Sequence, residues 1–434
     1  MTDDEFQKAI DDLTSDQTYE ALDAVWRNYC ISDILEPGST FKPFTIAGAL
    51  EDGIVKDGDT FFCKGYEIVA EGTSPIYCHN RSGDGTITLK QALEQSCNVA
   101  LMQIAKSEGR ETFSKYQDIF NFGNQTGIDL SGEGSGLVYD EEGLNPVELA
   151  TSSFGQGINV TMIQMITGFC SLINGGYYYE PHMVDKITNS NGATVENIEP
   201  RVLRQTISES TSAKIRQYCR ATVMEEGGDR RTGRTARPAG YAIGGKTGTA
   251  ETIPRKNGEY VVSFMGYAPA DDPQIAIYVV VDRANASPQD DAKFATGIVR
   301  NVLTEVLPYL NIFMTEELSE KEIQELAEKQ IEITNQYTQK PEDGEDQNNG
   351  DGTGDGQTGD DQTGSGDGTG DGQGGDDSTP SEDWRNYPVD PATGYLVSPI
   401  DGGLIDPVTG ADVGGDDSLG DSPVNNNLLN QQNE

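Results

Sequence analysis

A serine and a lysine three residues apart form the first pattern that could do chemistry. Ser39 follows Pro37-Gly38, and Lys42 lies three positions further along the chain. A helix predicted over about residues 39–51 would place both side chains on one face. A serine hydroxyl attacks a carbonyl carbon once a base takes its proton, and a neutral lysine is such a base. The pair therefore indicates covalent acyl transfer, although a helix cap beside a solvated lysine gives the same spacing.

Lys42 acts as a base only if its pKa falls well below that of an exposed lysine. Burial disfavours the ammonium form, and a second cation nearby disfavours it further. Lys246 is the candidate for that second cation. The two histidines, His79 and His182, are not placed to serve as the base, so we expect them to be ordinary surface or packing residues.

Two further patterns follow the first, and each occurs once in the chain. Ser96-Cys97-Asn98 falls at a predicted break between two helices, and Lys246-Thr247-Gly248-Thr249 falls on a predicted strand. A Ser-x-x-Lys pattern alone arises by chance in a chain of this length. All three in the order SxxK, SxN, KTG form the active-serine signature of penicillin-binding proteins and serine β-lactamases.

Beyond these patterns, the chain resembles class B penicillin-binding proteins of the division or sporulation type over about residues 22–310. The resemblance extends to the flanking sequences WRNYCISDILEPGSTFKPFTIAGALEDGIV, LEQSCNVALMQIA, SFGQGINVTMIQMITGFCSLINGG and AIGGKTGTAE. An SxN rather than an SDN pattern, together with KTGTAE, favours transpeptidases over class A β-lactamases. The resemblance implies a serine-type D,D-transpeptidase that cross-links D-Ala-D-Ala stem peptides of peptidoglycan, is acylated by β-lactams and needs no cofactor.

The resemblance also implies a role for each residue of the three patterns. Ser39 is the expected nucleophile and Lys42 its base, while Ser96 relays a proton toward the leaving amine. Asn98 is expected to hold Lys42 and the substrate amide. The substrate would lie along the KTG strand as an additional strand.

On that strand, Lys246, Thr247 and Thr249 are expected to receive the terminal carboxylate of the substrate. Gly248 would let the substrate backbone approach closely. The family places its oxyanion hole at the backbone N–H groups of Ser39 and Thr249.

The expected fold class is α+β, with helices packed against an antiparallel sheet. Three strand-like runs, YAIGGKTGTAE, EYVVSFMGYAP and QIAIYVVVD, predict an antiparallel meander followed by a helix over 290–309. Residues 1–35 read as polar helix, residues 177–195 as a hairpin and residues 316–337 as a last helix. The stretch 53–87 has no clear periodicity.

Composition divides the chain of 434 residues into three parts. Residues 1–310 are expected to form the transpeptidase domain and residues 311–340 a helical extension. The tail, 341–434, holds 21 of the 42 net negative charges, and its first forty residues are almost free of apolar side chains. Such a segment cannot bury enough surface to offset its ordering entropy, so the tail is predicted to be disordered. The acidic balance excludes nucleic acid as a partner.

The cysteines do not form a recognisable metal-binding pattern. Six are spread over the chain without a CxxC pair, and only two histidines accompany them, so no metal site is expected. Cys63 and Cys78 bound a turn-rich segment and are either a disulfide or two buried thiols. Cys97, which lies between two candidate site residues, either fills space or responds to oxidation.

Location and wider partners rest on the resemblance. The sequence shows neither the basic and apolar regions of a signal peptide nor an apolar run long enough to span a membrane. Family resemblance places the protein on the extracytoplasmic face of the cell membrane, beside membrane-associated division or sporulation proteins. Relatives carry an anchor, a pedestal domain and a first sheet strand before the serine helix, so we expect the transpeptidase domain to lack its N-terminal part.

Two other functions share the same motifs. A penicillin-sensing module would be acylated without turning over, and an inactive truncated remnant would keep the motifs without the chemistry.

Overall fold

The computed structural model describes residues 14–224, 231–331, 333, 396–397 and 404–405. The chain separates into two units, Met1–Gly344 and Glu345–Glu434, and all three sequence patterns lie in the first. Its helices are α2 Ser15–Trp26, α3 Tyr29–Ser32, α4 Lys42–Glu51, α5 Leu89–Glu94, α6 Asn98–Ile119, α7 Pro146–Ser152, α8 Met162–Ile173, α9 Glu209–Ala221, α10 Lys293–Tyr309 and α11 Glu320–Glu328, with the 3-10 helices η1 Gly38–Phe41 and η3 Arg234–Ala236.

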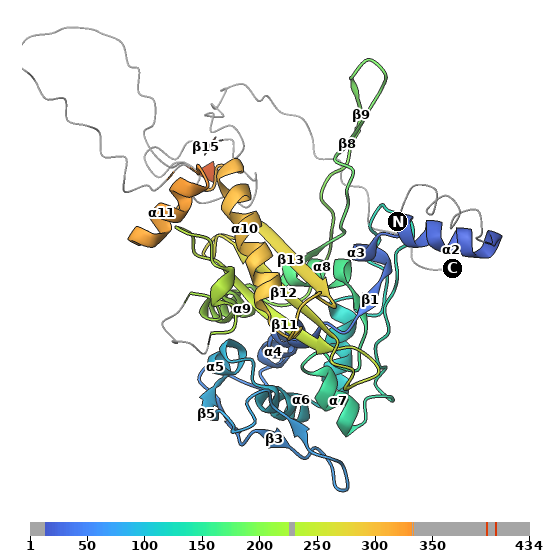
Figure 1. The fold of residues 1–434 in the computed structure, drawn as a ribbon, viewed down its shortest axis with the longest axis vertical. Coiled ribbons are helices and arrows are strands. Elements are labelled where there is room, and N and C mark those ends of the chain that lie inside the picture. The colour runs from blue at the N-terminus through green and yellow to red at the C-terminus, as the bar shows by residue number, and fades with distance from the viewer. Residues whose placement is uncertain (1–13, 225–230, 332, 334–395, 398–403, 406–434) are drawn as a thin grey trace, which may run out of the picture. The chain divides into compact units, whose positions relative to one another are not determined.

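A three-stranded antiparallel sheet forms the centre of the first unit (Figure 1). Its strands are β11 Gly244–Glu251, β12 Tyr260–Ala268 and β13 Ile275–Asp282, in the order β11-β12-β13. The register pairs Gly248 with Ser263, and Ser263 with Val280. This sheet confirms the predicted meander, and α10 follows it as expected.

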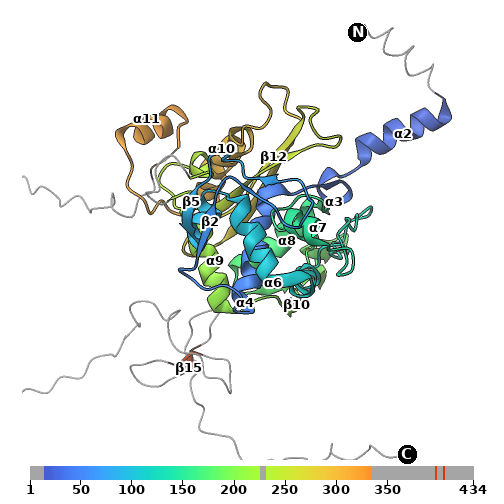
Figure 2. The same cartoon turned by 90° about the horizontal axis from the view of Figure 1, so that it is seen from below.

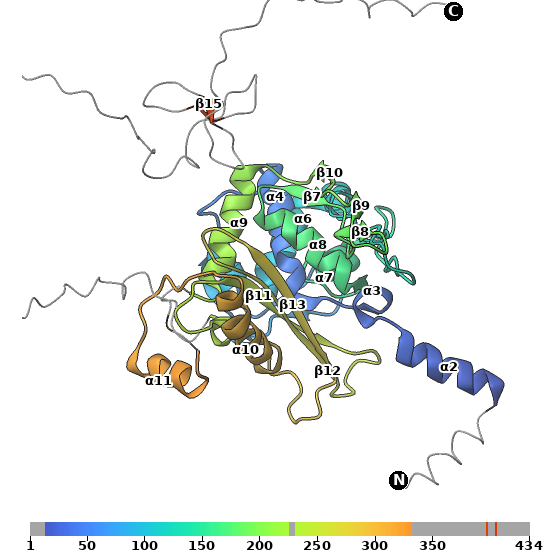
Figure 3. The ribbon, with the colours of Figure 1, turned by 90° about the horizontal axis from the view of Figure 1, so that it is seen from above.

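Side chains on β12 alternate between two hydrophobic cores. Met265 and Tyr267 face a larger core shared with α4, α6, α8 and α9, whereas Phe264 and Ala268 face a smaller core shared with α10 and α11. Helix α10 therefore covers one face of the sheet while α8 and α9 lie on the other, with α4 behind them (Figure 3). Period-two alternation buries both faces of the sheet under helices, and the α+β class that the sequence predicts is confirmed.

Short two-stranded pairs surround this centre. They are β1 Ile34–Leu35 with β6 Val160–Thr161, β2 Thr60–Cys63 with β5 Gly85–Thr88, β3 Tyr66–Glu67 with β4 Ile76–Tyr77, β7 Tyr177–Tyr179 with β10 Val202–Gln205, and β8 Lys186–Thr188 with β9 Thr194–Asn197. The β8–β9 hairpin extends away from the body of the unit (Figure 1). The predicted single hairpin over 177–195 is therefore wrong in part, because β7 pairs with β10 instead.

Several predicted boundaries shift for local reasons. Within α6, Gly109 leaves the helical region at φ 77° and ψ 165°, and this kink divides the range into two helices. Helix α11 is shorter than the predicted 316–337, because Ser319 caps its start with Glu322 and Gln330 follows its end at φ 56°. Residues 34–35 form β1, whereas helix was expected through residue 35.

Helix α2 extends away from the rest of the first unit (Figure 2). Most of the predicted disordered tail lies outside the described residues. Leu396–Val397 and Leu404–Ile405 form a short antiparallel pair, β14 and β15, so the prediction of disorder is wrong for these four residues. In the part of the chain that the structure describes, no helix is both long and apolar enough to cross a bilayer.

Candidate active site

Ser39 and Lys42 lie on consecutive turns of different helix type. Ser39 belongs to η1, and α4 begins at Lys42, whose backbone N–H donates to the carbonyl of Ser39. The predicted α-helix from residue 39 therefore opens with a tighter 3-10 turn. Pro43 occupies the first turn of α4, where its missing N–H removes no helical hydrogen bond. Ser39 is half-buried, whereas Lys42 is fully buried.

The amine of Lys42 bridges the two outer residues of the SxN pattern. Its Nζ donates to the backbone carbonyl of Ser96 at 2.6 Å, to Ser96 Oγ at 3.0 Å and to Asn98 Oδ1 at 2.8 Å. The structure thus brings together two of the predicted patterns, which are more than fifty residues apart in the sequence. These three oxygens hold the amine of Lys42 at one position.

Ser96 and Asn98 are presented by the junction between α5 and α6. Ser96 has a φ of 58°, a conformation that non-glycine residues adopt at a cost. Cys97 caps α6 through its side chain, which accepts from the backbone of Ala100. The amide of Asn98 also donates to the carbonyl of Tyr77 at 3.3 Å. The break predicted near Ser96 is confirmed, and it points the SxN residues at Lys42.

Burial lowers the pKa of Lys42 to about 8. Electrostatic interactions with Cys97, Cys78 and Asp84 oppose this shift. Lys246 was expected as a second cause, but burial alone lowers the pKa of Lys42, whereas the charge of Lys42 lowers the pKa of Lys246. A neutral amine is therefore accessible near physiological pH, as a base requires.

Lys246 is fully buried on β11, and its Nζ donates to the backbone carbonyl of Thr247 at 3.0 Å. Burial, followed by the charge of Lys42, lowers its pKa well below the usual value. An ammonium at this position depends on a nearby anion, so the expected capture of a carboxylate would be coupled to proton uptake by Lys246.

The backbone of η1 lies against β11. A Cβ on Gly38, which has a φ of 56°, would meet the carbonyl oxygen of Thr249 at 2.6 Å. Glycine is therefore required at residue 38. The same contact places Ser39 and Thr249, whose backbone N–H groups are the two expected oxyanion donors, on neighbouring segments. Thr249 is exposed and Thr247 is buried.

Gly248 has a packing role that the sequence did not predict. A Cβ at this position would overlap Ser263 Oγ and lie 2.9 Å from the carbonyl oxygen of Pro37. The space above Gly248 is thus filled by the protein itself. Gly248 therefore allows β11 to pack against the residues before Ser39. Its expected close approach to the substrate backbone stays a prediction.

Two charged residues near the site carry no motif and were missed in the sequence. Glu36 is buried and accepts two hydrogen bonds from Arg255 Nη2, at 2.6 and 2.7 Å, and one from the backbone of Gly157 at 2.9 Å. Gly155 also accepts a hydrogen bond from the backbone of Gly38. Glu36 therefore ties the loop after β11 to the Gly-rich segment beside Ser39. The sequence signal that could have identified Glu36 is an acidic residue directly before Pro37-Gly38, three positions ahead of Ser39.

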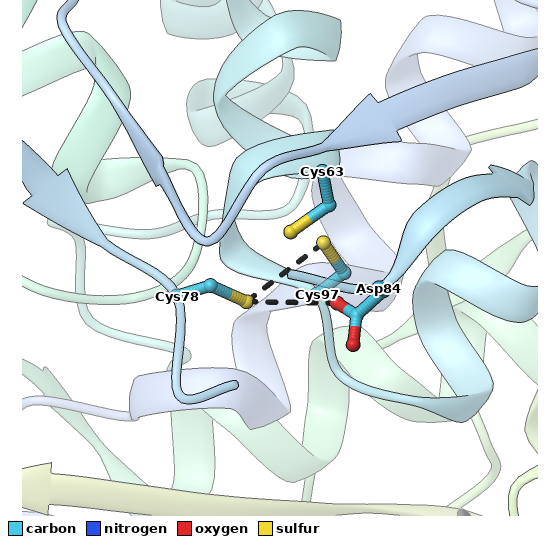
Figure 4. A group of neighbouring side chains, drawn as sticks. All are labelled: Cys63, Cys78, Asp84 and Cys97. Carbon is cyan, nitrogen blue, oxygen red and sulfur yellow. Dashed lines mark hydrogen bonds between the residues drawn. The ribbon is translucent and has the colours of Figure 1, made fainter. Parts of the chain in front are cut away.

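Four potential metal ligands meet beside the SxN junction (Figure 4). The side chains of Cys63, Cys78, Cys97 and Asp84 have ligand atoms within 4.8 Å of one another. The spacing of the cysteines along the chain gave no sign of this group, because it is the pairing of β2 with β5 and of β3 with β4 that brings the distant turns together. Cys63 and Cys78 are buried free thiols.

The sequence and the structure were compared with those of known proteins. Residues 5–304 match the Penicillin binding protein transpeptidase domain. The chain belongs to the penicillin-binding protein transpeptidase family. It is 40% identical over 319 residues to stage V sporulation protein D of Bacillus subtilis, with 71% of this chain and 48% of that protein covered. Peptidoglycan D,D-transpeptidase FtsI of Escherichia coli is 26% identical over 290 residues, which cover 66% of this chain and 46% of that protein.

Solved structures agree with the family assignment. Penicillin binding protein 3 of Mycobacterium tuberculosis, in complex with aztreonam, matches with a TM-score of 0.60 and 25% identity, covering 67% of this chain and 66% of that one. The chain spans about half the length of the curated relatives named above. The α+β penicillin-binding-protein fold predicted from the sequence is confirmed.

Proposed function

We propose that this protein is a serine-type peptidoglycan D,D-transpeptidase that cross-links D-Ala-D-Ala stem peptides and is acylated by β-lactams. The observation that carries the proposal is the buried amine of Lys42, which contacts Ser96 and Asn98 one turn from Ser39. Relatives whose names specify peptidoglycan D,D-transpeptidase activity support it.

In the first half of the proposed reaction, neutral Lys42 takes the proton of Ser39 as its Oγ attacks the carbonyl carbon of the penultimate D-Ala. The N–H groups of Ser39 and Thr249 stabilise the oxyanion. Ser96 then gives its hydroxyl proton to the leaving amine and takes a replacement from Lys42, so that the C–N bond breaks and the terminal D-Ala departs. Asn98 holds Lys42 and the substrate amide.

In the second half, an amine from another stem peptide attacks the acyl-serine and releases Ser39. During the first half, Lys246, Thr247 and Thr249 hold the terminal carboxylate of the donor peptide until its D-Ala departs. Strand β11 is at the edge of the described sheet, so its outer backbone groups are available to a peptide laid alongside it. No step of this chemistry uses a metal or cofactor.

We further propose that the enzyme works on the extracytoplasmic face of the cell membrane, together with membrane-associated division or sporulation proteins. The residue ranges proposed for its parts are 1–310 for the transpeptidase domain, 311–340 for the helical extension and 341–434 for the acidic tail. The supporting observations are the family membership and the names of its relatives.

Turnover of a stem peptide tests the proposed function. Purified protein is mixed with a D-Ala-D-Ala pentapeptide and an amine acceptor, and released D-Ala and cross-linked product are measured by mass spectrometry. The proposal predicts both products from the wild type and neither from Ser39→Ala. Acylation of Ser39 by a β-lactam without turnover of the pentapeptide would instead identify a penicillin-sensing module.

A further inference from the structure

Four arginines line one pocket on the side of the first unit where α10 and α11 lie (Figure 3). The pocket has a volume of about 570 Å³. One arginine follows α9, two lie in and directly after η3, and one belongs to α10. They are Arg231, Arg234, Arg237 and Arg300, four of the 15 arginines in the chain. Three separate segments of an acidic protein therefore bring guanidinium groups to the same place.

Two of these arginines are fixed by glutamates of α11. Arg237 Nη1 donates to Glu322 Oε1 at 2.6 Å, and Arg300 Nη2 donates to Glu325. A guanidinium carries five N–H donors, so one such contact leaves most of them for other partners. The Nε atoms of Arg237 and Arg300 are buried and make no hydrogen bond within the described residues. Each arginine thus carries a donor into the interior for which the described chain supplies no acceptor.

The other two arginines are anchored by the backbone. Arg231 Nη1 donates to the carbonyl oxygen of Val223 at 2.8 Å, just beyond the last turn of α9. Arg234 Nη1 donates to the carbonyl oxygen of Arg231 at 3.4 Å. These contacts orient both guanidinium groups at the wall of the pocket.

We propose that this pocket binds one phosphate group, either inorganic phosphate or a small phosphomonoester. A guanidinium binds a phosphate through two parallel N–H···O bonds, which an ammonium group cannot form. Guanidinium groups from three segments can approach a tetrahedral anion from different sides, whereas a carboxylate offers only two oxygens. A bound phosphate would also give acceptors to the buried Nε donors of Arg237 and Arg300.

The acidic residues around the pocket limit the size of the ligand. Glu316 and Glu322 also line it, so four positive and two negative side chains leave a formal charge of +2. Helix α11, which borders the pocket, contributes four glutamates, and the net charge of the chain is −42. A polyanion or an anionic membrane would extend over these acids and be repelled. A single phosphate group is small enough to contact the arginines alone.

Arginines that only secure α11 account less well for this arrangement. Ion pairs with Glu322 and Glu325 explain the Nη contacts of Arg237 and Arg300. They do not explain the Nε donors, which are buried without a hydrogen bond in the described part of the chain. A buried donor that lacks an acceptor costs about 1–3 kcal/mol, so a ligand that supplies one gains affinity.

The segment that lines the pocket also reaches two of the motif-bearing elements. Thr232 Oγ1 donates to the carbonyl oxygen of Glu94 at 3.4 Å, two residues before the SxN pattern. Thr222 Oγ1 donates to the carbonyl oxygen of Gly245, directly before the KTG pattern. A phosphate held by the arginines would therefore restrain the segment that joins these elements. The site does not depend on the proposed reaction, because phosphate binding is measured without substrate.

Titration of the full chain with inorganic phosphate tests the proposal. Protein in a phosphate-free buffer is titrated by isothermal calorimetry, and its melting temperature is measured in phosphate and in sodium chloride of equal ionic strength. We expect saturable binding of one phosphate per chain and a melting temperature that rises by several degrees in phosphate only. Flotation with vesicles of phosphatidylglycerol should show no binding. Binding to these vesicles without binding of inorganic phosphate would overturn the proposal.

Matched variants locate the bound phosphate. Arg237→Lys keeps the charge but loses the guanidinium fork, so it should bind phosphate at least about tenfold more weakly. Arg234→Gln should weaken binding as well, and because Arg234 is exposed this variant disturbs no buried contact. Arg201→Gln, which alters an exposed arginine outside the pocket, should bind as the wild type does.

A variant of the KTG strand separates this pocket from the candidate active site. Lys246→Ala should retain phosphate binding, because Lys246 does not line the pocket. Loss of binding in Lys246→Ala would place the phosphate in the active site and overturn the proposal. The proposal is also overturned if the wild type shows no saturable binding up to about 10 mM phosphate. Equal affinities of Arg234→Gln, Arg237→Lys and Arg201→Gln would overturn it too.

Discussion

The acylation rate of this protein should rise with pH through the pKa of Lys42. The amine of Lys42 must lose its proton before it can accept one from Ser39, so the neutral fraction of Lys42 sets the rate. Burial lowers the pKa of this amine to about 8. The rate should therefore increase about tenfold for each pH unit below that value and level off above it.

The size of the effect follows from the two pKa values. With a pKa of about 8, roughly one amine in ten is neutral at about pH 7, whereas a lysine at the ordinary value of 10.5 would have roughly one in three thousand. Burial of Lys42 thus supplies about 300-fold more base at neutral pH. Between about pH 7 and pH 9 the rate should rise about tenfold.

The assay is stopped-flow or gel-based acylation by a fluorescent penicillin, measured at a fixed excess of the antibiotic across this pH range. Lys42→Arg should lose acylation at every pH, because a guanidinium stays protonated. Lys246→Ala should weaken capture of the carboxylate, retain part of the rate and keep the rise with pH. A flat profile in the wild type, or equal and modest losses in both variants, would refute the assignment of the base.

Three further predictions concern residues around the site. Glu108 is buried without hydrogen-bond partners for its carboxylate, and burial raises its pKa to about 8, so the folded state keeps a proton that the unfolded state releases above about 4.5. The stability of the fold should therefore fall as the pH rises between these two values, by up to about 1.4 kcal/mol per pH unit. Melting curves of Glu108→Gln should show a flatter fall. Gly248→Ala should cost about 1–3 kcal/mol in urea unfolding and slow acylation, since its methyl group would overlap Ser263 Oγ. Glu36→Gln should weaken the contact with Arg255, cost about 1 kcal/mol and slow acylation, and an unchanged rate would remove Glu36 from the positioning residues.

The sequence was sufficient to predict the sheet and the helices that present the motifs. Strands β11, β12 and β13 read clearly because long apolar and β-branched runs are separated by short turns. The SxxK and SxN patterns could be joined in one site because their order is characteristic of a known family. The contact of Lys42 with Ser96 and Asn98 agrees with that inference.

Contacts between distant turns could not be read from the sequence. The gathering of Cys63, Cys78 and Cys97 depends on four short strands whose pairing has no strong periodic signal. The role of Gly248 depends on where Pro37 packs, which is a property of the tertiary fold. Residue types at a motif could be predicted, whereas the atoms that fill the space beside them could not.

Mapping the acylated residue tests the central claim most directly. The protein is incubated with a fluorescent penicillin, its intact mass is measured, and the labelled peptide is sequenced by tandem mass spectrometry. We predict one adduct per wild-type chain, located on Ser39. A folded Ser39→Ala variant should carry no adduct. An adduct that persists in Ser39→Ala, or that maps to another residue of the wild type, would contradict it.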